Sequence, residues 1–368
     1  MLLITKKKIF IILYIFFILF LIEFFSYLAI KTLSDKAVFY NQIQVNQSYE
    51  NYTKVRDPLL GWKNNNSDNY GARIDKSNFS KYKVCIDMYG DSFTYGLEVN
   101  DIDAWPSKLS EKLRCRVRNY GVVGYGTDQA YLKYQYQSRE HSKIVVLNHL
   151  SEDILRNINQ FQNLLYPNSE FALKPRFIIL NNKLTLIKTI NLTKLEFKEF
   201  LLSPQKFLKY EYFIPSGDSG VQTASFPYSV SLAKALKHYH VRAILKNKSR
   251  TEEFYQQNHK SQSLQITEKI MKEFERSARE KGLIPIVTII PTCRDFEHKN
   301  IHGDFPYKNL SKELNKYSSF FIDFGLEIIQ YKSNYKDLYV NCSSHMNKIG
   351  NQVLSEIFEI KIKEKQLF

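Results

Sequence analysis

Residues 84–96 read VCIDMYGDSFTYG and join an apolar run to a tight turn that carries a serine. The run Val84–Tyr89 has the length and composition of a buried strand. A glycine directly after a strand gives the backbone room for a sharp turn, so Gly90 and Asp91 would place Ser92 at the carboxyl end of the strand. Open α/β sheets bind their ligands at that edge. The stretch therefore predicts a functional serine on a parallel sheet.

Four further apolar runs have the length of strands and alternate with amphipathic helices, which predicts a parallel sheet covered on both faces. These runs are Arg116–Tyr120, Ile144–Leu150, Ile284–Ile290 and Phe320–Asp323. Two helices are well defined by apolar stripes, one over Leu264–Lys281 and the last over about Met346–Lys363. The sequence thus predicts the α/β class.

The composition is typical of a folded globular protein. The chain has 368 residues, of which 44% are hydrophobic and 24% charged, with 13 Gly and 10 Pro. This balance excludes collagen-like, low-complexity and disordered chains. The net charge of +15 favours a polyanionic partner such as an anionic lipid surface, an acidic glycan or nucleic acid.

Residues 9–30 form an apolar run of 22 residues that only Glu23 interrupts. A helix of that length crosses a hydrocarbon core of about 30 Å. Lysines 6–8 precede the run and no small-residue cleavage site follows it, so we interpret it as an uncleaved signal anchor with a cytoplasmic N-terminus. A cleaved signal peptide is the alternative. In both cases the body is extracytoplasmic, periplasmic or extracellular, which argues against nucleic acid as a partner.

The predicted domain organisation follows from these patterns. Residues 1–8 form a cytoplasmic tail, 9–30 the transmembrane anchor and 31–80 a polar stalk and N-terminal extension. The α/β domain covers 81–365. It is interrupted before the fourth strand by an insertion at about 158–263, where long Lys-, Leu-, Phe- and Asn-rich stretches show few clean periods.

Three sequence blocks resemble those of the SGNH (GDSL-type) hydrolases. In that family the first block supplies a nucleophilic serine, which Ser92 matches. The second places a glycine after the second strand as an oxyanion donor, and Gly124 in NYGVVG, residues 119–124, fits this position. The last supplies a histidine before the final helix, and His345 in SHMNKIG, residues 344–350, fits. The resemblance implies a Ser–His acyl-enzyme mechanism, with the backbone N–H groups of Ser92 and Gly124 holding the oxyanion.

The resemblance covers roughly residues 84–157 and 265–365. It implies a flavodoxin-like, three-layer α/β/α fold with a five-stranded parallel sheet in the strand order 2-1-3-4-5. The N-terminal 80 residues and the insertion lie outside it.

Two positions depart from the family's pattern. The third block normally supplies an asparagine that donates to the oxyanion, but Glu152 stands in its place, and a carboxylate cannot donate unless it is protonated. His149 or Asn157 could substitute for that asparagine. Alternatively, Glu152 and Asp153 simply cap a helix.

The second departure concerns the acid that orients the base. It normally lies two or three residues before the histidine, where this chain has Cys342 and Ser343. Asp337 and Asp323 are the candidate substitutes, with a structural role as the alternative for Asp323. A Ser–His dyad oriented by a backbone carbonyl is a further alternative.

The four cysteines permit three disulfide connectivities. Cys85 and Cys115 lie at the starts of two strands expected to be neighbours, which favours a bridge between them. Cys293 and Cys342 lie in loops expected at the active-site edge, where a bridge would fix the loop of His345. Four buried free thiols are the alternative.

We expect no metal and no cofactor. His298 and His302, with Asp295 and Glu297, lack the spacing of a zinc motif, and the chain has no Cys-x-x-Cys pair.

The resemblance, the anchor and the basic body together suggest a function. We expect a membrane-anchored serine esterase or O-acyltransferase that acts on ester groups, foremost O-acetyl, of a cell-envelope or exported polysaccharide. An anionic glycan is the expected partner, and a membrane protein of a polysaccharide assembly system is a further candidate. Among aromatic side chains, Trp62, Trp105, Tyr95 and Tyr125 are candidate sugar contacts.

Two other functions remain open at this stage. One is a catalytically inactive SGNH-fold protein that binds or assembles glycans. The other is hydrolysis of phospholipids or thioesters near the bilayer.

Overall fold

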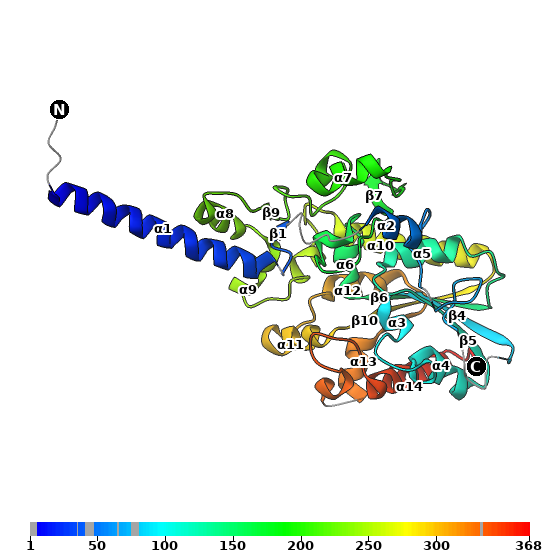
Figure 1. Ribbon diagram of the computed structural model, residues 1–368. Coiled ribbons are helices and arrows are strands. Elements are labelled where there is room, and N and C mark those ends of the chain that lie inside the picture. The colour runs from blue at the N-terminus through cyan, green and yellow to red at the C-terminus, as the bar shows by residue number, and fades with distance from the viewer. Residues whose placement is uncertain (1–5, 35, 41–47, 65, 75–80, 332–333) are drawn as a thin grey trace. The chain divides into compact units, whose positions relative to one another are not determined.

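The computed structural model describes residues 6–34, 36–40, 48–64, 66–74, 81–331 and 334–368 (Figure 1). The chain forms two compact units, each described by itself below. Unit 1 comprises Met1–Lys54, Phe161–Ala172 and Leu192–Asn247. Unit 2 comprises Val55–Gln160, Leu173–Asn191 and Lys248–Phe368.

Unit 2 is built on a five-stranded, all-parallel sheet with the order β11-β10-β6-β4-β5. In chain order its strands are β4 (Val84–Gly90), β5 (Arg116–Gly121), β6 (Ile144–Leu150), β10 (Ile284–Ile290) and β11 (Phe321–Asp323). Numbered by their appearance in this sheet, they lie in the order 2-1-3-4-5. The α/β class, the five parallel strands and the strand order expected from the resemblance are therefore confirmed.

The central strand, β6, is buried along its whole length, as expected for a parallel strand covered on both faces. It pairs with β10 over seven residues, from Ile144 opposite Ile284 to Leu150 opposite Ile290. Each of the five expected strands lies within one residue of its predicted bounds, because short β-branched and apolar runs between turn residues are a strong signal.

Helices cover both faces of the sheet (Figure 1). On one face α5 (Thr127–Gln135) and α10 (Ser263–Glu280) contact each other and pack on β4, β6 and β10. On the other face α4 (Trp105–Leu113), α13 (Phe324–Tyr331) and α14 (Lys348–Glu364) pack together. The expected apolar stripe of α10 is buried, from Ile266 to Ala278.

The remaining helices of unit 2 are α3 (Ser92–Tyr95), α6 (Asp153–Arg156), α11 (Cys293–His302) and α12 (Lys308–Tyr317), with short 3-10 turns at Asp101–Asp103, Glu252–Tyr255 and Tyr335–Leu338.

Two small antiparallel hairpins complete unit 2. One joins β2 (Arg56–Asp57) to β3 (Gly61–Trp62). The other joins β7 (Arg176–Leu180) to β8 (Lys183–Ile187) through Asn181 and Asn182, which both have positive φ angles, 48° and 61°. Two consecutive left-handed residues define the tight turn whose twist matches a hairpin, and asparagine tolerates that conformation.

The unit boundaries differ from the domain boundaries expected from the sequence. Residues 55–74 were placed in the stalk and N-terminal extension, but they belong to unit 2. The expected insertion is divided, since 161–172 and 192–247 lie in unit 1 whereas 173–191 and 248–263 lie in unit 2. Contacts between segments far apart in the chain set these boundaries, and such contacts leave no local pattern in the sequence.

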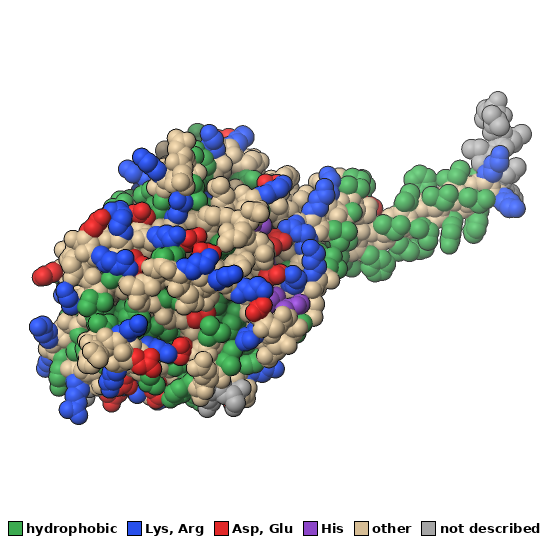
Figure 2. All heavy atoms as spheres, turned by 180° about the vertical axis from the view of Figure 1, so that it is seen from behind, with side chains coloured by type: hydrophobic (Ala, Val, Ile, Leu, Met, Phe, Trp, Pro, Cys, Tyr) green, Lys and Arg blue, Asp and Glu red, His purple; other side chains and the backbone are tan. Residues whose placement is uncertain are grey.

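Unit 1 contains a long apolar helix, α1 (Lys6–Ser34). Residues 7–34 have a mean hydropathy of 2.8 over their most apolar stretch, so the helix is long and apolar enough to cross a membrane. Figure 2 shows apolar side chains along its exposed length.

The other helices of this unit are α2 (Tyr49–Val55, which ends at the boundary), α7 (Lys194–Leu202), α8 (Tyr228–Ala235) and α9 (Tyr239–Leu245), with 3-10 turns at Gln162–Leu164 and Pro204–Lys206. The short strands β1 (Phe39–Tyr40) and β9 (Gln222–Thr223) pair in parallel.

Candidate active site

Ser92 lies directly beyond the end of β4, as the first residue of the one-turn helix α3. Asp91 caps this helix, because its Oδ1 accepts a hydrogen bond of 2.9 Å from the N–H of Phe93. Gly90 is required for the close approach, since a Cβ there would lie 2.1 Å from Thr94 Oγ1. The turn therefore forms as expected, with the serine side chain 2% exposed.

The His345 side chain reaches Ser92 from a loop near the opposite end of unit 2's sequence. Its Nε2 lies 2.8 Å from Ser92 Oγ, at hydrogen-bond distance. The ring of Phe93 packs on the imidazole, with their centroids 4.9 Å apart. The two residues that the resemblance implies as nucleophile and base are thus brought together across 253 positions of sequence.

Two structural elements hold the loop of His345. Asn347 caps α14 by accepting from the N–H groups of Ile349 and Gly350 at 2.9 and 3.1 Å. Cys342 forms a disulfide with Cys293, the first residue of α11. This bridge and the one between Cys85 and Cys115 are the pairs expected from the sequence, so the alternative of four free thiols is wrong.

The acid beside His345 is Glu98, which sequence reasoning missed. Its Oε1 lies 3.5 Å from His345 Nδ1 and also accepts a hydrogen bond of 2.9 Å from Ser344 Oγ. Of the acids in the described part of the chain, only Glu98 lies within 4.0 Å of a ring nitrogen of His345. No hydrogen bond joins the two at this distance, but the negative charge of the carboxylate favours the tautomer with its proton on Nδ1, which leaves Nε2 free to accept the proton of Ser92. The Glu98 side chain is 38% exposed, so solvent weakens the interaction.

The structure does not bring Asp323 or Asp337 to His345. Both carboxylate oxygens of Asp323 are bound elsewhere in the core, where Oδ2 accepts from Ser311 Oγ at 2.7 Å and Oδ1 from the N–H of Gly325 at 3.0 Å. Burial raises the pKa of Asp323. Asp337 is exposed, and its backbone carbonyl accepts from Asn347 Nδ2 at 2.9 Å. The expectation that one of these two aspartates orients His345 is therefore wrong.

The resemblance implies two backbone N–H groups as oxyanion donors, and both belong to turns at this edge of the sheet. Ser92 is the first residue of its helix, so its N–H has no acceptor within that helix. Gly124 follows β5 in a turn that the N–H of Tyr125 closes onto the carbonyl of Val122 at 3.2 Å. The φ of Gly124 is +81°, the left-handed value that the third residue of a type II turn requires. Both turns leave the carboxyl edge of the sheet beside each other, because β4 and β5 are paired as far as Gly90 and Gly121.

Residues 60–64 support the turn of Gly124. Asn64 donates from Nδ2 to the carbonyl of Gly121 at 3.0 Å and accepts from the N–H of Val123 at 3.2 Å. The indole of Trp62 donates to the carbonyl of Val123 at 2.9 Å. These contacts explain why residues from Val55 onward belong to unit 2.

The aromatic candidates for sugar contacts fall into two groups. Trp105 and Tyr125 are fully buried, and Tyr95 is 9% exposed, so these three belong to the core and the expectation that they contact sugars is wrong. Trp62 is half-buried beside the Gly124 turn and remains a candidate.

A buried arginine, Arg156, links the turns of Ser92 and Gly124. Its Nη1 donates to Asp91 Oδ2 at 3.2 Å and to the carbonyl of Tyr125 at 3.0 Å. It also donates to Asp153 Oδ1 at 2.9 Å. Asp91 and Tyr125 are the neighbours of Ser92 and Gly124 in the sequence, and Asp91 Oδ2 itself lies 3.4 Å from Ser92 Oγ. The Arg156 guanidinium therefore links the two turns, with the two hydrogens of Nη1 shared among three acceptors.

Glu152, which stands in the position of the family's asparagine, pairs with Arg250. Its Oε1 lies 2.9 Å from Arg250 Nη2. Burial acts to raise the pKa of Glu152, but Arg250, Arg156 and Arg294 outweigh burial and lower that pKa below its usual value. The side chain is therefore ionised at neutral pH and is no hydrogen-bond donor, so the expectation that it belongs to the oxyanion site is wrong.

His149 and Asn157 do not replace the missing donor either. Thr127 Oγ1 lies 2.6 Å from His149 Nδ1, and the hydroxyl of Tyr255 lies 2.8 Å from Nε2. Burial lowers the pKa of His149 to about 3, so this ring is neutral. Asn157 Nδ2 donates to Thr267 Oγ1 at 2.8 Å. Both side chains are buried, and their hydrogen bonds join residues of the core.

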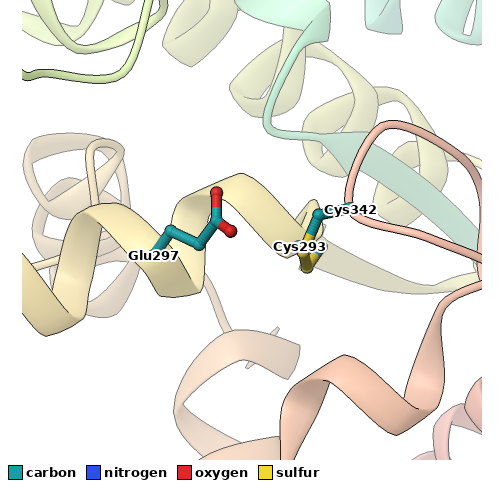
Figure 3. Close-up of side chains that lie close together, drawn as sticks. All are labelled: Cys293, Glu297 and Cys342. Atoms are coloured by element: carbon teal, nitrogen blue, oxygen red, sulfur yellow. A yellow bond between two sulfur atoms is a disulfide. The ribbon is translucent and has the colours of Figure 1, made fainter.

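One group of potential metal ligands lies at the start of α11. Cys293, Glu297 and Cys342 have their ligand atoms within 4.8 Å of one another (Figure 3). The two sulfurs are joined in the disulfide, and metal binding needs free thiolates, so the oxidised pair leaves Glu297 alone. His298 instead accepts at Nδ1 from the N–H of Ser249 at 3.0 Å.

No family model and no curated protein sequence matches the chain. Among solved structures, a protein assigned to the lipolytic G-D-S-L family from Desulfitobacterium hafniense DCB-2 is 13% identical, with a TM-score of 0.38, and the match covers 76% of this chain and 99% of that one. A member of the same family from Veillonella parvula DSM 2008 is 12% identical, with a TM-score of 0.37 and coverage of 75% and 97%. A family two carbohydrate esterase from Clostridium thermocellum, solved with cellohexaose, is 10% identical, with a TM-score of 0.35 and coverage of 77% and 65%. TM-scores below 0.5 are too low to assign a function, which therefore rests on the geometry of the site.

Sequence reasoning missed three residues of this site. They are Glu98, Asn64 and Arg156. Glu98 and Asn64 lie in irregular loops, and Arg156 lies four residues after Glu152. In the sequence, all three residues lie close to a family-like block or to a cluster of turn residues. Their neighbours share that property, so the sequence does not single these three out.

The geometry predicts that Glu98 orients His345. We expect Glu98→Gln to lower kcat for ester hydrolysis about 10- to 100-fold with little change in KM. This loss is smaller than the roughly 10⁴-fold effect of a fully buried acid, because Glu98 is partly in water. The measurement is steady-state hydrolysis of an activated acetate ester by the full chain in detergent.

Asp337→Asn is the matched control, because its carboxylate does not contact His345. We expect this variant to keep wild-type kcat. A loss of kcat in Asp337→Asn together with normal kcat in Glu98→Gln would show that the acid has been assigned wrongly.

Proposed function

We propose that this protein is a serine esterase of the SGNH type, anchored in a membrane by α1, with its body on the extracytoplasmic side. The observation that carries the proposal is the 2.8 Å contact between Ser92 Oγ and His345 Nε2 at the carboxyl edge of the parallel sheet. A serine hydroxyl within hydrogen-bond distance of an imidazole, with an acid beside the second ring nitrogen, is the arrangement that activates a nucleophile.

The proposed reaction proceeds in two halves. Ser92 Oγ attacks the ester carbonyl while His345 Nε2 takes its proton. The tetrahedral intermediate then expels the alcohol, which receives that proton, and an acyl-Ser92 ester remains. His345 next takes a proton from an incoming hydroxyl, which attacks the acyl carbonyl. The bond between the acyl carbon and Ser92 Oγ then breaks, and His345 returns the proton to Oγ, which restores both side chains. Water as the acceptor gives hydrolysis, whereas a sugar hydroxyl gives acyl transfer.

The negative charge of the tetrahedral intermediate would be held by the N–H groups of Ser92 and Gly124. Two donors from separate turns stabilise one oxygen only if their separation is fixed before the reaction. Arg156 supplies this constraint, because the same Nη1 binds Asp91 and Tyr125.

We propose that the substrate is an O-acyl group, foremost O-acetyl, on a cell-envelope or exported polysaccharide. The net charge of +15 suits an anionic glycan. The half-buried Trp62 beside the Gly124 turn offers an aromatic surface of the kind on which sugar rings stack. A membrane protein of a polysaccharide assembly system would be a suitable partner for an anchored enzyme of this kind.

The alternative of an inactive glycan-binding protein depends on two conditions. Glu152 would face the nucleophile, and no acid would reach His345. In the structure Glu152 pairs with Arg250, and Glu98 lies 3.5 Å from His345 Nδ1. The geometry therefore favours the enzyme.

The direct test of the proposed activity is release of p-nitrophenol from p-nitrophenyl acetate by the full chain in detergent. We expect Ser92→Ala and His345→Ala to reduce the rate to that of buffer, because either change removes the activated nucleophile. A wild-type rate no faster than both variants would contradict the proposal. Acetylated polysaccharide as a substrate then separates hydrolysis, which releases acetate, from transfer to an added sugar.

Replacement of Arg156 tests whether it positions the two oxyanion donors. We expect Arg156→Met to lower kcat about 100-fold at nearly constant KM, since a small misplacement of donors affects the transition state far more than substrate binding. Arg156→Lys keeps the charge but has one nitrogen at the end of a flexible stem, so it should recover part of the rate.

Arg118→Met is the matched control for loss of a buried arginine. Arg118 pairs with Asp87 inside the sheet at 2.5 Å and contacts neither turn. We expect this variant to lose roughly 3–5 kcal/mol of stability and to keep its kcat while folded. Equal losses of kcat in Arg156→Met and Arg118→Met would show that Arg156 acts through stability alone.

A further inference from the structure

Glu23 is the only acid in the apolar run of α1, and the start of α8 binds it. Its carboxylate accepts from the N–H of Tyr228 at 2.5 Å, from the N–H of Ser229 at 3.3 Å and from the Ser229 hydroxyl. The ring of Tyr228 also packs against that of Tyr27, with centroids 5.2 Å apart. The N-terminus of α8 is therefore held against α1 at the level of Glu23.

The position of Glu23 sets the depth of this contact if α1 spans a membrane. Counting about 20 residues for the hydrocarbon core from Ile9, the first residue after the lysines, places its outer boundary near Leu28. Glu23 then lies about five residues, or roughly 7 Å, inside that boundary. A carboxylate at such a depth is costly unless it is hydrogen-bonded, and the start of α8 satisfies it.

The rest of α8 and the following helix pack along the C-terminal part of α1. Ala235 is buried in a cluster with Ile30, Val38 and Phe39. Leu232 of α8 and Val241 of α9 pack against the same cluster. Both helices are thus fixed to the part of α1 that would leave the membrane.

Large apolar side chains on these two helices and at their start nevertheless face outward. Their exposed fractions are 72% for Phe226, 48% for Val230, 57% for Leu236, 65% for Ile244 and 70% for Leu245. On α9, Ile244 and Leu245 follow Val241 by three and four residues, so all three lie on one face of the helix. Val241 packs against the cluster beside α1, whereas Ile244 and Leu245, one turn further on, are exposed.

The segment that contains α8 and α9 carries only positive charges. Residues 219–247 contain four cations, Lys234, Lys237, Arg242 and Lys246, and no aspartate or glutamate. Exposed apolar side chains beside lysines, with no acids, are the composition of an interfacial element that inserts apolar groups below anionic headgroups.

We propose that residues 225–246, here termed the α8–α9 wedge, insert into the extracytoplasmic leaflet beside α1, with Phe226 in the acyl region and the lysines at anionic headgroups. The proposal rests on the proposed anchoring of α1 and adds a second, independent contact with lipid. Unit 1 would then be held at the bilayer surface by a wedge and a span rather than by a span alone.

The test uses single-cysteine variants of the full chain, each labelled with an environment-sensitive dye, in vesicles of phosphatidylcholine and phosphatidylglycerol. The four native cysteines are all in disulfides, so only the introduced thiol reacts. Phe226→Cys and Leu245→Cys report on the wedge. Leu195→Cys, in α7 of the same unit and 79% exposed, is the matched control. Tyr14→Cys reports on α1.

We expect lipid-borne nitroxide to quench the dye several-fold more at positions 226 and 245 than at 195, and aqueous iodide to show the reverse order. Replacing Lys234, Lys237 and Lys246 by Gln should reduce nitroxide quenching at position 245 in vesicles that contain phosphatidylglycerol. Quenching by iodide at 226 and 245 equal to that at 195 would place the wedge in water and overturn the proposal.

Three further outcomes would also overturn it. Protection of positions 226 and 245 from both quenchers would show that a protein, not lipid, covers the wedge. Nitroxide quenching at position 14 but not at 226 would leave the anchor intact and reject the wedge alone. Absence of quenching at position 14 would instead reject the anchor on which the wedge depends.

Discussion

The parallel sheet of unit 2 imposes the constraint on which the site depends. Because its strands all point the same way, β4, β5, β6 and β10 end at one edge, and the chain leaves each of them there. Ser92 follows β4, Gly124 follows β5, and Arg156 follows β6 within a few residues. Ser92, Gly124 and the arginine that links their turns are therefore brought to one edge by strand direction, before any specific side-chain contact is made. The disulfide between Cys293, after β10, and Cys342 then holds the His345 loop at the same edge.

The residues of this site differ in how much of their role can be read from the sequence. Ser92, Gly124 and His345 could be named because the short blocks around them resemble those of the SGNH hydrolases. The five strands were predicted from the apolar runs themselves. The acid was not predicted. Its usual place in the chain holds no acid, and the two substitutes chosen, Asp337 and Asp323, do not contact His345. Glu98 reaches His345 from the loop that follows α3, and nothing in its sequence neighbourhood marks it. An acid can orient a histidine from any position in the chain that folds close to the ring nitrogen. Which residue does so is therefore decided by tertiary structure and not by a local sequence pattern.

Glu152 shows a different limit of the sequence. Its place in the third block predicted a carboxylate where the family has a hydrogen-bond donor to the oxyanion. In the structure Arg250, nearly 100 residues later, binds that carboxylate, and a buried guanidinium, Arg156, pairs with Asp91, the residue before the serine. The same long-range contacts make residues 55–74 part of unit 2 and divide the expected insertion between the units. In unit 1, the sequence shows Glu23 only as the one charged residue that interrupts an apolar run. In the structure its carboxylate binds the start of α8.

The central claim is that His345 activates Ser92 as a nucleophile, and covalent trapping tests it most directly. The full chain would be treated with an alkyl fluorophosphonate, and the rate of modification and the modified residue would be measured by mass spectrometry. The account predicts one adduct, on the peptide that contains Ser92, formed rapidly by the wild type and at a much lower rate by His345→Ala. An unmodified Ser92, or modification of Ser92 at the same rate in both chains, would contradict it.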